Sequence, residues 1–481
     1  MSLATLDRRL VNYRAHRAST EALVRPHETA RATAIDRSDL AERLATALDA
    51  EIVRTPSGTL VRHERPSRHL PIDRDRLAGL PGQPAADVPL VCLDIETTGL
   101  ATAAGTVAFL VGLGWWEADR FRQVQLLLPD QADEPALLNE LSGRIPLEGW
   151  LVTYNGRSFD WPLLVARYRL ARRAPPLHAG HLDLLPVVRR IFRHRMENAR
   201  LRTVEAVLLG MHRRGDVEGW EIPGRYLDFL RFGAAEPLVD VVRHNDEDVR
   251  SLALLLAHLE SSYGDRAVRA VAPAGDLAGL GRSFAIDGRL VDALECLDAA
   301  LASGGTPLRS VAATAEQRIA TAPDRSAADD THWWSPRYRP DFGGRPLARI
   351  AENAWRAAAP SRVDVPWTDE RMLLERARLL RRLGRHRDAE TAWSHLARAG
   401  GRLGILAWIE VAKVREHRLL DLPGALAATA AADLLAGGQR RGGRPLPWHE
   451  RELAHRRHRL ERRLGRLEPA NFAVRPAPAG A

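Results

Sequence analysis

The sequence predicts an α/β domain with a mixed sheet, followed by an all-α domain. Between residues 88 and 265, short apolar runs rich in Val, Ile and Leu alternate with stretches of helical period. After residue 275 the chain becomes alanine-rich, and only helical patterns remain. A chain of 481 residues is long enough for two or three domains.

Composition narrows the class of protein. No apolar run is long enough to span a bilayer, and residues 1–20 lack the apolar core of a signal peptide, so we expect a cytoplasmic protein with no membrane partner. The two cysteines, Cys92 and Cys296, exclude a disulfide framework and a thiolate zinc cluster. The net charge of +9 suits a polyanionic partner. Lys413 is the single lysine, however, and such a composition is also typical of a GC-rich genome.

Two segments precede the α/β pattern. Residues 1–35 are polar and have no clear period, which predicts a flexible segment. Within residues 36–87, leucines spaced four apart over 40–48 predict a helix. Two strand-like runs on either side of residues 56–58 then predict a hairpin, and a linker rich in Pro and Gly follows.

The α/β pattern of residues 88–265 has a definite order. Three β-rich runs separated by turn residues predict consecutive antiparallel strands, and helices then alternate with further strands. This order is typical of a ribonuclease-H-like fold. In chain order, we expect strands at 91–100, 105–117 and 120–128, a helix at 134–145, a strand at 149–155, and helices at 160–170 and 236–260.

Residues 276–470 are expected to form an all-α, helical-repeat domain. The motif Gly-Arg-x-x-Asp-Ala occurs at 288–293 and again at 384–389, each time at the start of an alanine-rich helix. This pattern resembles tetratricopeptide-type (TPR-like) helical hairpins, although ordinary Ala/Leu helices would also produce it. Residues 471–481 are expected to form a flexible tail.

Two features of this domain have alternative interpretations. An irregular insertion at about residues 320–347 contains Trp333 and Trp334, which suit base stacking or packing onto the helices. The last helical stretch, 449–468, is rich in arginine. Such a stretch suits contact with phosphates or a solvated helix face, and the second interpretation is favoured.

Acidic residues in the α/β domain are candidates for chemistry. Asp94 and Glu96 lie one residue apart on a strand, so they project from the same face and repel each other unless a cation lies between them. Asp160 opens a helix after a strand, which is also a common N-cap position. Asp183 ends a further short strand, with His181 nearby, and is interpreted as structural.

The long helix carries the third acidic segment. His244 and Asp248 are four residues apart and share one otherwise apolar face, where they need partners. Asp246 and Glu247 are expected to face solvent.

Taken together, four carboxylates and one histidine predict a site for hard cations. Oxygen ligands without cysteine favour Mg²⁺ or Mn²⁺ over zinc. Two such ions activate a water and stabilise the leaving oxygen of a phosphodiester. A histidine can take the proton from that water near neutral pH.

The motifs "LDIETTGL", "YNGRSFD" and "HNDEDV" resemble the three exonuclease motifs of the DEDD (DnaQ-like) superfamily. More narrowly, residues 88–262 resemble the YprB ribonuclease-H-like family, with "GTVAFLVGLGWWE", "HLDLLPVVRR" and "EIPGRYLDFL" in the same order. One departure concerns the histidine-type members. Many of them have four residues between the base and the last aspartate, whereas three separate His244 from Asp248, as in the tyrosine-type subgroup.

The resemblance implies a 3′–5′ exonuclease that uses two divalent metal ions, Mg²⁺ or Mn²⁺. It implies metal ligands at Asp94, Glu96, Asp160 and Asp248, and a general base at His244. It implies contacts to the terminal nucleotide from Leu100, Asn155 and Phe159, and Thr97 in the turn beside Leu100 joins this substrate-binding set.

The resemblance also implies partners. The favoured substrate is single-stranded or 3′-ended DNA, with RNA as an alternative. Members of the resembling family occur beside superfamily-2 helicases in DNA repair, so a helicase bound to the helical domain is a hypothesis. A structure-specific endonuclease and a catalytically silent nucleic-acid-binding scaffold are the rival interpretations.

Overall fold

The computed structural model describes residues 39–99, 105–303, 369–443 and 446–465. Several expectations fall outside these residues. They concern the flexible ends, the insertion at about 320–347 with its two tryptophans, and the substrate contact at Leu100.

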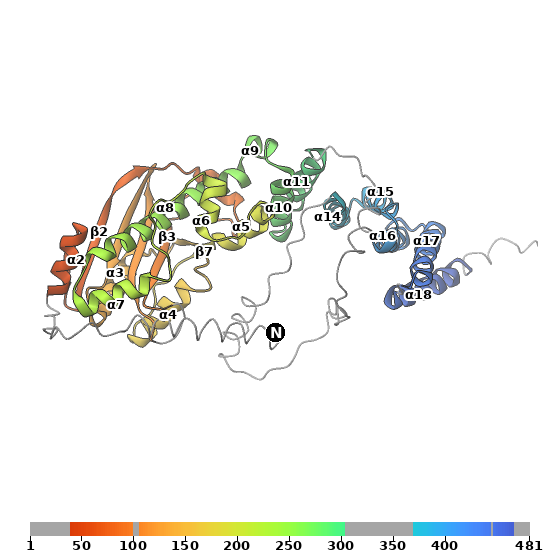
Figure 1. Ribbon diagram of the computed structural model, residues 1–481. Coiled ribbons are helices and arrows are strands. Elements are labelled where there is room, and N and C mark those ends of the chain that lie inside the picture. Colours follow the sequence, from red (N-terminus) through yellow and green to blue (C-terminus); the bar gives the residue numbers. More distant parts are fainter. Residues whose placement is uncertain (1–38, 100–104, 304–368, 444–445, 466–481) are drawn as a thin grey trace, which may run out of the picture.

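A mixed sheet in the order β1-β2-β5-β4-β3-β6-β7 forms the centre of the α/β domain (Figure 1). The first five strands in this order, β1-β2-β5-β4-β3, are each antiparallel to their neighbours. On the other side of β3, β6 runs parallel to β3 and β7 runs parallel to β6. The strands are β1 (Glu51–Thr55), β2 (Gly58–His69), β3 (Leu90–Thr97), β4 (Ala108–Glu117), β5 (Arg120–Leu127), β6 (Trp150–Thr153) and β7 (Gly180–Asp183).

This sheet confirms the ribonuclease-H-like expectation. Three consecutive antiparallel strands, β3 to β5, are followed by two strands that continue the sheet in parallel on the other side of β3. The hairpin β1–β2, expected in the segment ahead of this domain, pairs through β2 with β5 and so extends the same sheet.

Helices cover the sheet. The helices of the α/β domain are α2 (Leu40–Leu48), α3 (Glu134–Arg144), α4 (Asp160–Leu170), α5 (Leu184–Phe192), α6 (Leu201–Val204), α7 (Ile222–Phe232) and α8 (Glu236–Gly264). Short 3₁₀-helices lie at η2 (Arg74–Gly79), η3 (Gln131–Asp133) and η4 (Arg193–Arg195), and a π-helix, η5, spans Glu205–Leu209.

Alternate residues of β3 enter two different cores. Leu90 and Cys92 pack in the core that includes α5 and the centre of α8. Val91 and Leu93 pack in the core that includes α3 and α4. Asp94 has the same parity as Cys92, so its carboxylate projects toward α8. The expected apolar positions of the long helix are all buried, namely Val241, Val242, Val249, Leu252, Leu256 and Leu259.

The C-terminal region is all-helical, as expected. Its helices are α9 (Arg266–Ala270), α10 (Ala274–Ile286), α11 (Leu290–Ser303), α14 (Asp369–Arg382), α15 (His386–Ala397), α16 (Gly401–Val414), α17 (Leu422–Arg441) and α18 (Pro447–Gly465), with a π-helix, η6 (Arg415–Leu419). Successive helices from α14 onward pack on one another, α11 packs on α14, and α10 packs on both α5 and α11. None of the helices in the described ranges is long and apolar enough to cross a membrane.

The repeated motif marks two helix starts. Gly288 and Gly384 adopt φ values of 80° and 74°, a left-handed conformation that glycine adopts without strain. Each lies two residues before the first residue of its helix, α11 or α15. The aspartate of the motif pairs with the arginine three residues before it in both copies, as Arg289–Asp292 and Arg385–Asp388.

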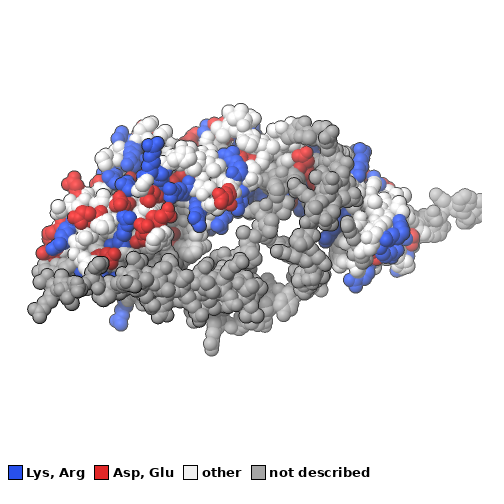
Figure 2. Space-filling view, in the orientation of Figure 1, with Lys and Arg blue, Asp and Glu red and all other residues white. Residues whose placement is uncertain are grey.

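Three arginines of the last helix form ion pairs within the protein. Arg456, Arg459 and Arg463 of α18 all pair with Glu416, a fully buried carboxylate of the π-helix η6. These arginines therefore hold α18 against η6, which lies before α17 in the chain. Figure 2 shows basic and acidic side chains interspersed over the visible face of the α/β domain, so the net charge of +9 is not gathered into one patch there.

Candidate functional site

Four carboxylates meet at one end of the sheet, beside β3. Asp94 and Glu96 lie on β3, Asp160 is the first residue of α4, and Asp248 lies on α8. Because β3 and its neighbour β6 are parallel, the segments that leave their carboxyl ends lie at the same edge of the sheet. The charges of Asp160 and Asp248 act on both carboxylates of β3, so the structure brings the four expected residues together.

This cluster is costly to ionise. Burial, together with the charges of the other three carboxylates, raises the pKa of Asp94 well above its ordinary value. Burial and the charges of Asp248 and Asp160 have the same effect on the pKa of Glu96. Burial raises the pKa of Asp160 to about 7, although backbone hydrogen bonds oppose the shift. Burial also raises the pKa of Asp248, and this effect outweighs that of nearby basic side chains.

Asn245 of α8 fixes the orientation of Asp94. Its Nδ2 donates a hydrogen bond to Oδ2 of Asp94 at 2.9 Å, and its Oδ1 accepts one from Nε2 of Gln125 on β5, also at 2.9 Å. Gly112 of β4 allows this close approach, because a Cβ there would lie 2.2 Å from Oδ1 of Asn245. Sequence reasoning missed Asn245. The available signal was a polar side chain between apolar positions of a buried helix face.

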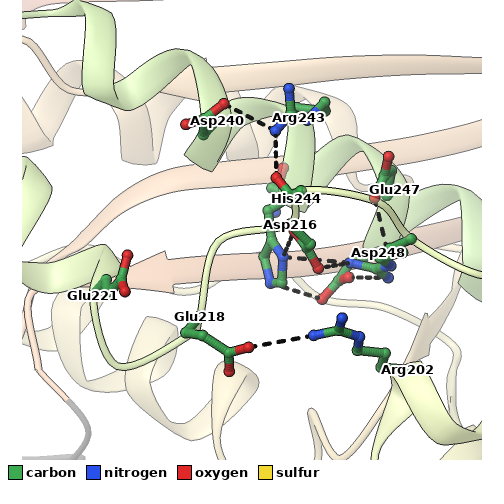
Figure 3. Close-up of polar contacts among 12 residues, drawn as sticks. Arg202, Asp216, Glu218, Glu221, Asp240, Arg243, His244, Glu247 and Asp248 are labelled. Atoms are coloured by element: carbon green, nitrogen blue, oxygen red, sulfur yellow. Dashed lines mark hydrogen bonds and ion pairs between the residues drawn. The ribbon is translucent and has the colours of Figure 1, made fainter.

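His244 lies at the edge of the carboxylate cluster, and Asp216 contacts the side of its ring that faces away from the cluster. Its Nδ1 is 2.7 Å from Oδ1 of Asp216, and its Nε2 lies 3.7 Å from Oδ2 of Asp248 (Figure 3). The same Nε2 lies 3.9 Å from Oε1 of Glu96. A carboxylate only accepts hydrogen bonds, so this partner assigns the ring proton to Nδ1. The lone pair of Nε2 then faces the carboxylate cluster.

Asp216 is a functional candidate that the sequence did not reveal. Its side chain is buried in the loop between α6 and α7. Burial alone would raise the pKa of Asp216, but the hydrogen bond from His244 and the charge and hydrogen bond of Arg213 lower it overall. Asp216 therefore stays ionised beside the histidine. The motif "RRGDVEGW" gave no periodic or spacing signal for this role.

Arg213 links the histidine and carboxylate groups. Its Nε donates to Oε2 of Glu205 at 2.8 Å, and its Nη2 donates to Oε1 of the same carboxylate. Its Nη1 lies 3.3 Å from Oδ2 of Asp216, and its Nη2 lies 2.5 Å from Oδ1 of Asp248. Glu247 completes the group, with Oε2 3.5 Å from Nε. Burial acts to lower the pKa of Arg213, but Asp248 and Glu205 raise it overall, so the guanidinium stays charged.

Asp183 shapes the turn that leads to Asp160. Its carboxylate accepts hydrogen bonds from the backbone N–H groups of Asn155, at 2.7 Å, and Arg157, at 3.3 Å. Asn155 has a φ of 69°, so this turn departs from the strand direction directly after β6. Asp183 also accepts from the N–H of Leu185 as the N-cap of α5. These bonds agree with the structural interpretation of Asp183.

The substrate-binding candidates that the structure describes lie close in sequence to the carboxylates. Phe159 immediately precedes Asp160, and its side chain is 49% exposed, an unusual position for a phenylalanine. Asn155 lies in the turn after β6, and Thr97 ends β3, where its hydroxyl donates to the carbonyl of Gly99 at 2.6 Å.

The expectation that Asp246 faces solvent is wrong. Its residue is 4% exposed, and its carboxylate lies 3.4 Å from both Arg65 and Arg68 of β2. The extension of the sheet by β2 covers this side of α8, which explains the burial. Glu247 is partly exposed and reaches Arg213.

Several of these side chains suit a divalent cation chemically. Carboxylate oxygens are the ligands that Mg²⁺ and Mn²⁺ prefer, and four mutually repelling carboxylates with raised pKa values are the environment that a cation would stabilise. Across the described ranges, no three His, Cys, Asp or Glu side chains are arranged to hold a metal ion together. At Asp248, the Arg213 guanidinium takes one carboxylate oxygen.

Comparisons with known proteins define the class of the α/β domain. Residues 91–260 match the sequence model of the RNase_H superfamily, and with the strand order this match makes the domain ribonuclease-H-like. A fold of this class indicates a nuclease.

A particular relative matches part of the chain. "Uncharacterized protein YprB" of Bacillus subtilis (strain 168) is 40% identical over 172 residues. The match covers 35% of this chain and 41% of the relative, so it spans less than half of either protein.

Proposed function

We propose that this protein is a metal-dependent nuclease, specifically a 3′–5′ exonuclease that acts on DNA in DNA repair. The observation that carries the proposal is the cluster of four partly buried carboxylates, with a histidine at its edge, at one end of a ribonuclease-H-like sheet. Nucleases with this fold generally use divalent metal ions. The activity, substrate and partners of the whole chain are part of the proposal.

The carboxylates are the proposed ligands of two cations, Mg²⁺ or Mn²⁺. When bound, such ions polarise the attacking water and stabilise the negative charge on the leaving oxygen. The ligands would be Asp94, Glu96, Asp160 and Asp248. In this role, Asn245 keeps one oxygen of Asp94 engaged and orients the other.

His244 is the proposed general base. Its Nδ1 is bonded to Asp216, so its Nε2 is free to take a proton from the attacking water. As the water oxygen bonds to phosphorus, the bond from phosphorus to the 3′ oxygen of the preceding nucleotide breaks and a nucleoside monophosphate leaves. Asp216 then stabilises the imidazolium that has formed.

The exposed ring of Phe159 is proposed to stack on the terminal base. Asn155, Thr97 and Leu100 complete the proposed nucleotide contacts. The C-terminal helical region is the proposed docking surface for a helicase, and a purification of the intact chain with its partners would test that part separately.

The experiment uses the full chain with 3′-labelled and 5′-labelled single-stranded DNA and Mn²⁺. We expect mononucleotide release from the wild type, and a loss of turnover in the Asp94→Asn/Glu96→Gln variant with DNA binding retained. Equal turnover by both proteins, or none by either, would contradict the proposal and favour a silent scaffold.

Two further substrates separate the rival activities. A blocked 3′ end stops an exonuclease but leaves a structure-specific endonuclease active. Matched RNA and DNA strands of one sequence decide the substrate class, and a clear preference for RNA would overturn the DNA assignment while leaving the proposed site intact.

A further inference from the structure

A buried arginine lies inside the carboxylate site. The Arg213 side chain is 5% exposed, and its Nη2 lies 2.5 Å from Oδ1 of Asp248. Its charge partly offsets the repulsion among the carboxylates, and it lowers the pKa of Glu96. Asp248 therefore already has a cationic partner in the protein itself.

Arg213 has a second buried partner, Glu205, whose contact does not involve Asp248. Glu205 is fully buried and accepts two N–H groups of the guanidinium, a bidentate pair with strong directional preference. This glutamate is the first residue of the π-helix η5, an uncommon element that often marks functional sites. Release of Asp248 would leave the buried guanidinium paired with Glu205.

The contact with Asp216 is also independent of Asp248. It uses Nη1, whereas the contact with Asp248 uses Nη2. The bond between Asp216 and Nδ1 of His244 is likewise made by the other carboxylate oxygen. The arrangement around the histidine can therefore persist when Asp248 changes partner.

We propose that Arg213 is a resident cation that competes with a divalent metal ion for Asp248. In the metal-free protein it pairs with Asp248. When metal binds, Asp248 turns to the ion and Arg213 remains with Glu205 and Asp216. This inference rests on the proposed function, because it assigns Asp248 as a metal ligand. It makes metal affinity depend on a side chain that is not itself a ligand.

The test compares Mn²⁺ binding by calorimetry in the wild-type full chain and in a Glu205→Gln/Arg213→Met variant. This double substitution removes one positive and one negative charge, so the net charge near the site is unchanged. The competing contact is lost, together with the contacts of Arg213 to Asp216 and Glu247. We expect the variant to bind Mn²⁺ about tenfold more tightly, which is within the usual range for coupling between two binding events. We also expect its melting temperature in EDTA to fall, and added Mn²⁺ to restore more of it than in the wild type.

A matched control separates competition from general destabilisation. Arg456 and Glu416 form another buried pair, with side chains 7% and 0% exposed, between α18 and the second π-helix. The Glu416→Gln/Arg456→Met variant should lose thermal stability without a change in Mn²⁺ affinity. If its affinity changes as much as that of the test variant, the competition is refuted.

A second variant covers the case in which the double variant does not fold. Arg213→Lys keeps the charge but cannot hold two carboxylates with a planar fork, so Mn²⁺ should again bind more tightly than in the wild type. Unchanged or weaker Mn²⁺ binding in the folded variants would overturn the role of Arg213 and leave the proposed nuclease site standing. Absence of Mn²⁺ binding in the wild type would overturn both.

Discussion

Nδ1 of His244 lies 2.7 Å from Oδ1 of Asp216, and the two residues come from different elements, α8 and the loop before α7. The bond fixes both the rotation of the imidazole and its tautomer. Because Nδ1 carries the proton, Nε2 is the basic nitrogen, and it is this nitrogen that faces Glu96 and Asp248.

The first prediction concerns this pair. In the Asp216→Asn variant the amide can donate to Nδ1, which places the ring proton on Nε2 and removes the base. We expect nuclease turnover to fall on the order of 10²-fold, with little change in DNA affinity. Single-turnover cleavage and fluorescence-detected DNA binding measure the two quantities.

Asp240→Asn is the matched control for Asp216. Asp240 lies one turn before His244 on α8 and pairs with Arg225 and Arg243, away from the imidazole (Figure 3). The control should retain wild-type turnover. Wild-type turnover in Asp216→Asn as well would exclude the positioning role.

A second prediction concerns the packing of α8 on the sheet. In Gly112→Ala the new Cβ would lie 2.2 Å from Oδ1 of Asn245 and 2.7 Å from Cγ2 of Val249, so the helix must shift. We expect a loss of about 2 kcal/mol in the free energy of unfolding, and reduced turnover because Asn245 loses its position against Asp94.

The same substitution elsewhere provides the control. Gly143 lies in α3, and a Cβ there would have no neighbour within 4 Å. Gly143→Ala should stabilise the protein slightly, because alanine is the better helix former. Urea denaturation of both variants measures the contrast, and equal stabilities would contradict the close approach at Gly112.

A third prediction concerns the end of the helical region. Glu416→Gln removes the charge that Arg456, a buried side chain, faces at 2.8 Å. We expect a loss of about 3 kcal/mol in the stability of α16 to α18, since a buried ion pair that loses one partner leaves an uncompensated charge. Nuclease turnover should not change. The exposed Glu461→Gln, on the same helix as Arg456, should affect neither quantity, and similar melting of both variants would contradict the prediction.

The order of elements in the α/β domain could be predicted because it depends on local patterns. Alternation in β3 and the helical period of α8 are visible in short windows, and the four-residue spacing of His244 and Asp248 is itself local. The pairing of β2 with β5 joins residues 51 to 66 positions apart, so no short window of the sequence can reveal it. That pairing is also why Asp246 is buried against Arg65 rather than solvated.

The carboxylates could be proposed from sequence because their motifs resemble a known family. Their surroundings could not. Asp216 and Arg213 lie in a loop 28 to 35 positions before their partners on α8, and only the folded chain brings them together. Their residue types are as common in solvated loops, so composition carried no signal. The side chains that shift the pKa values of the carboxylates and orient the histidine therefore come together only through tertiary structure.

The last prediction concerns pH. In EDTA, lowering the pH from about 8 to about 6 should protonate Asp160 in the folded protein, where burial raises its pKa to about 7 from the ordinary value of 3.8, but not in the unfolded chain. The folded state then binds more protons, so Asp160 contributes stability as the pH falls, and Asp94 and Glu96 act in the same direction. Buried histidines such as His181, whose pKa burial lowers to about 3, oppose this trend, so the diagnostic quantity is the difference between the wild type and Asp160→Asn. We expect the wild type to gain about 2–4 °C in melting temperature relative to the variant over this range.

Saturating Mn²⁺ requires ionised ligands and should reverse the sign of that difference, because metal binding then competes with protons. Thermal melting at three pH values, with EDTA or with Mn²⁺, measures both slopes, and a wild-type advantage in EDTA that grows with rising pH would contradict the raised pKa of Asp160.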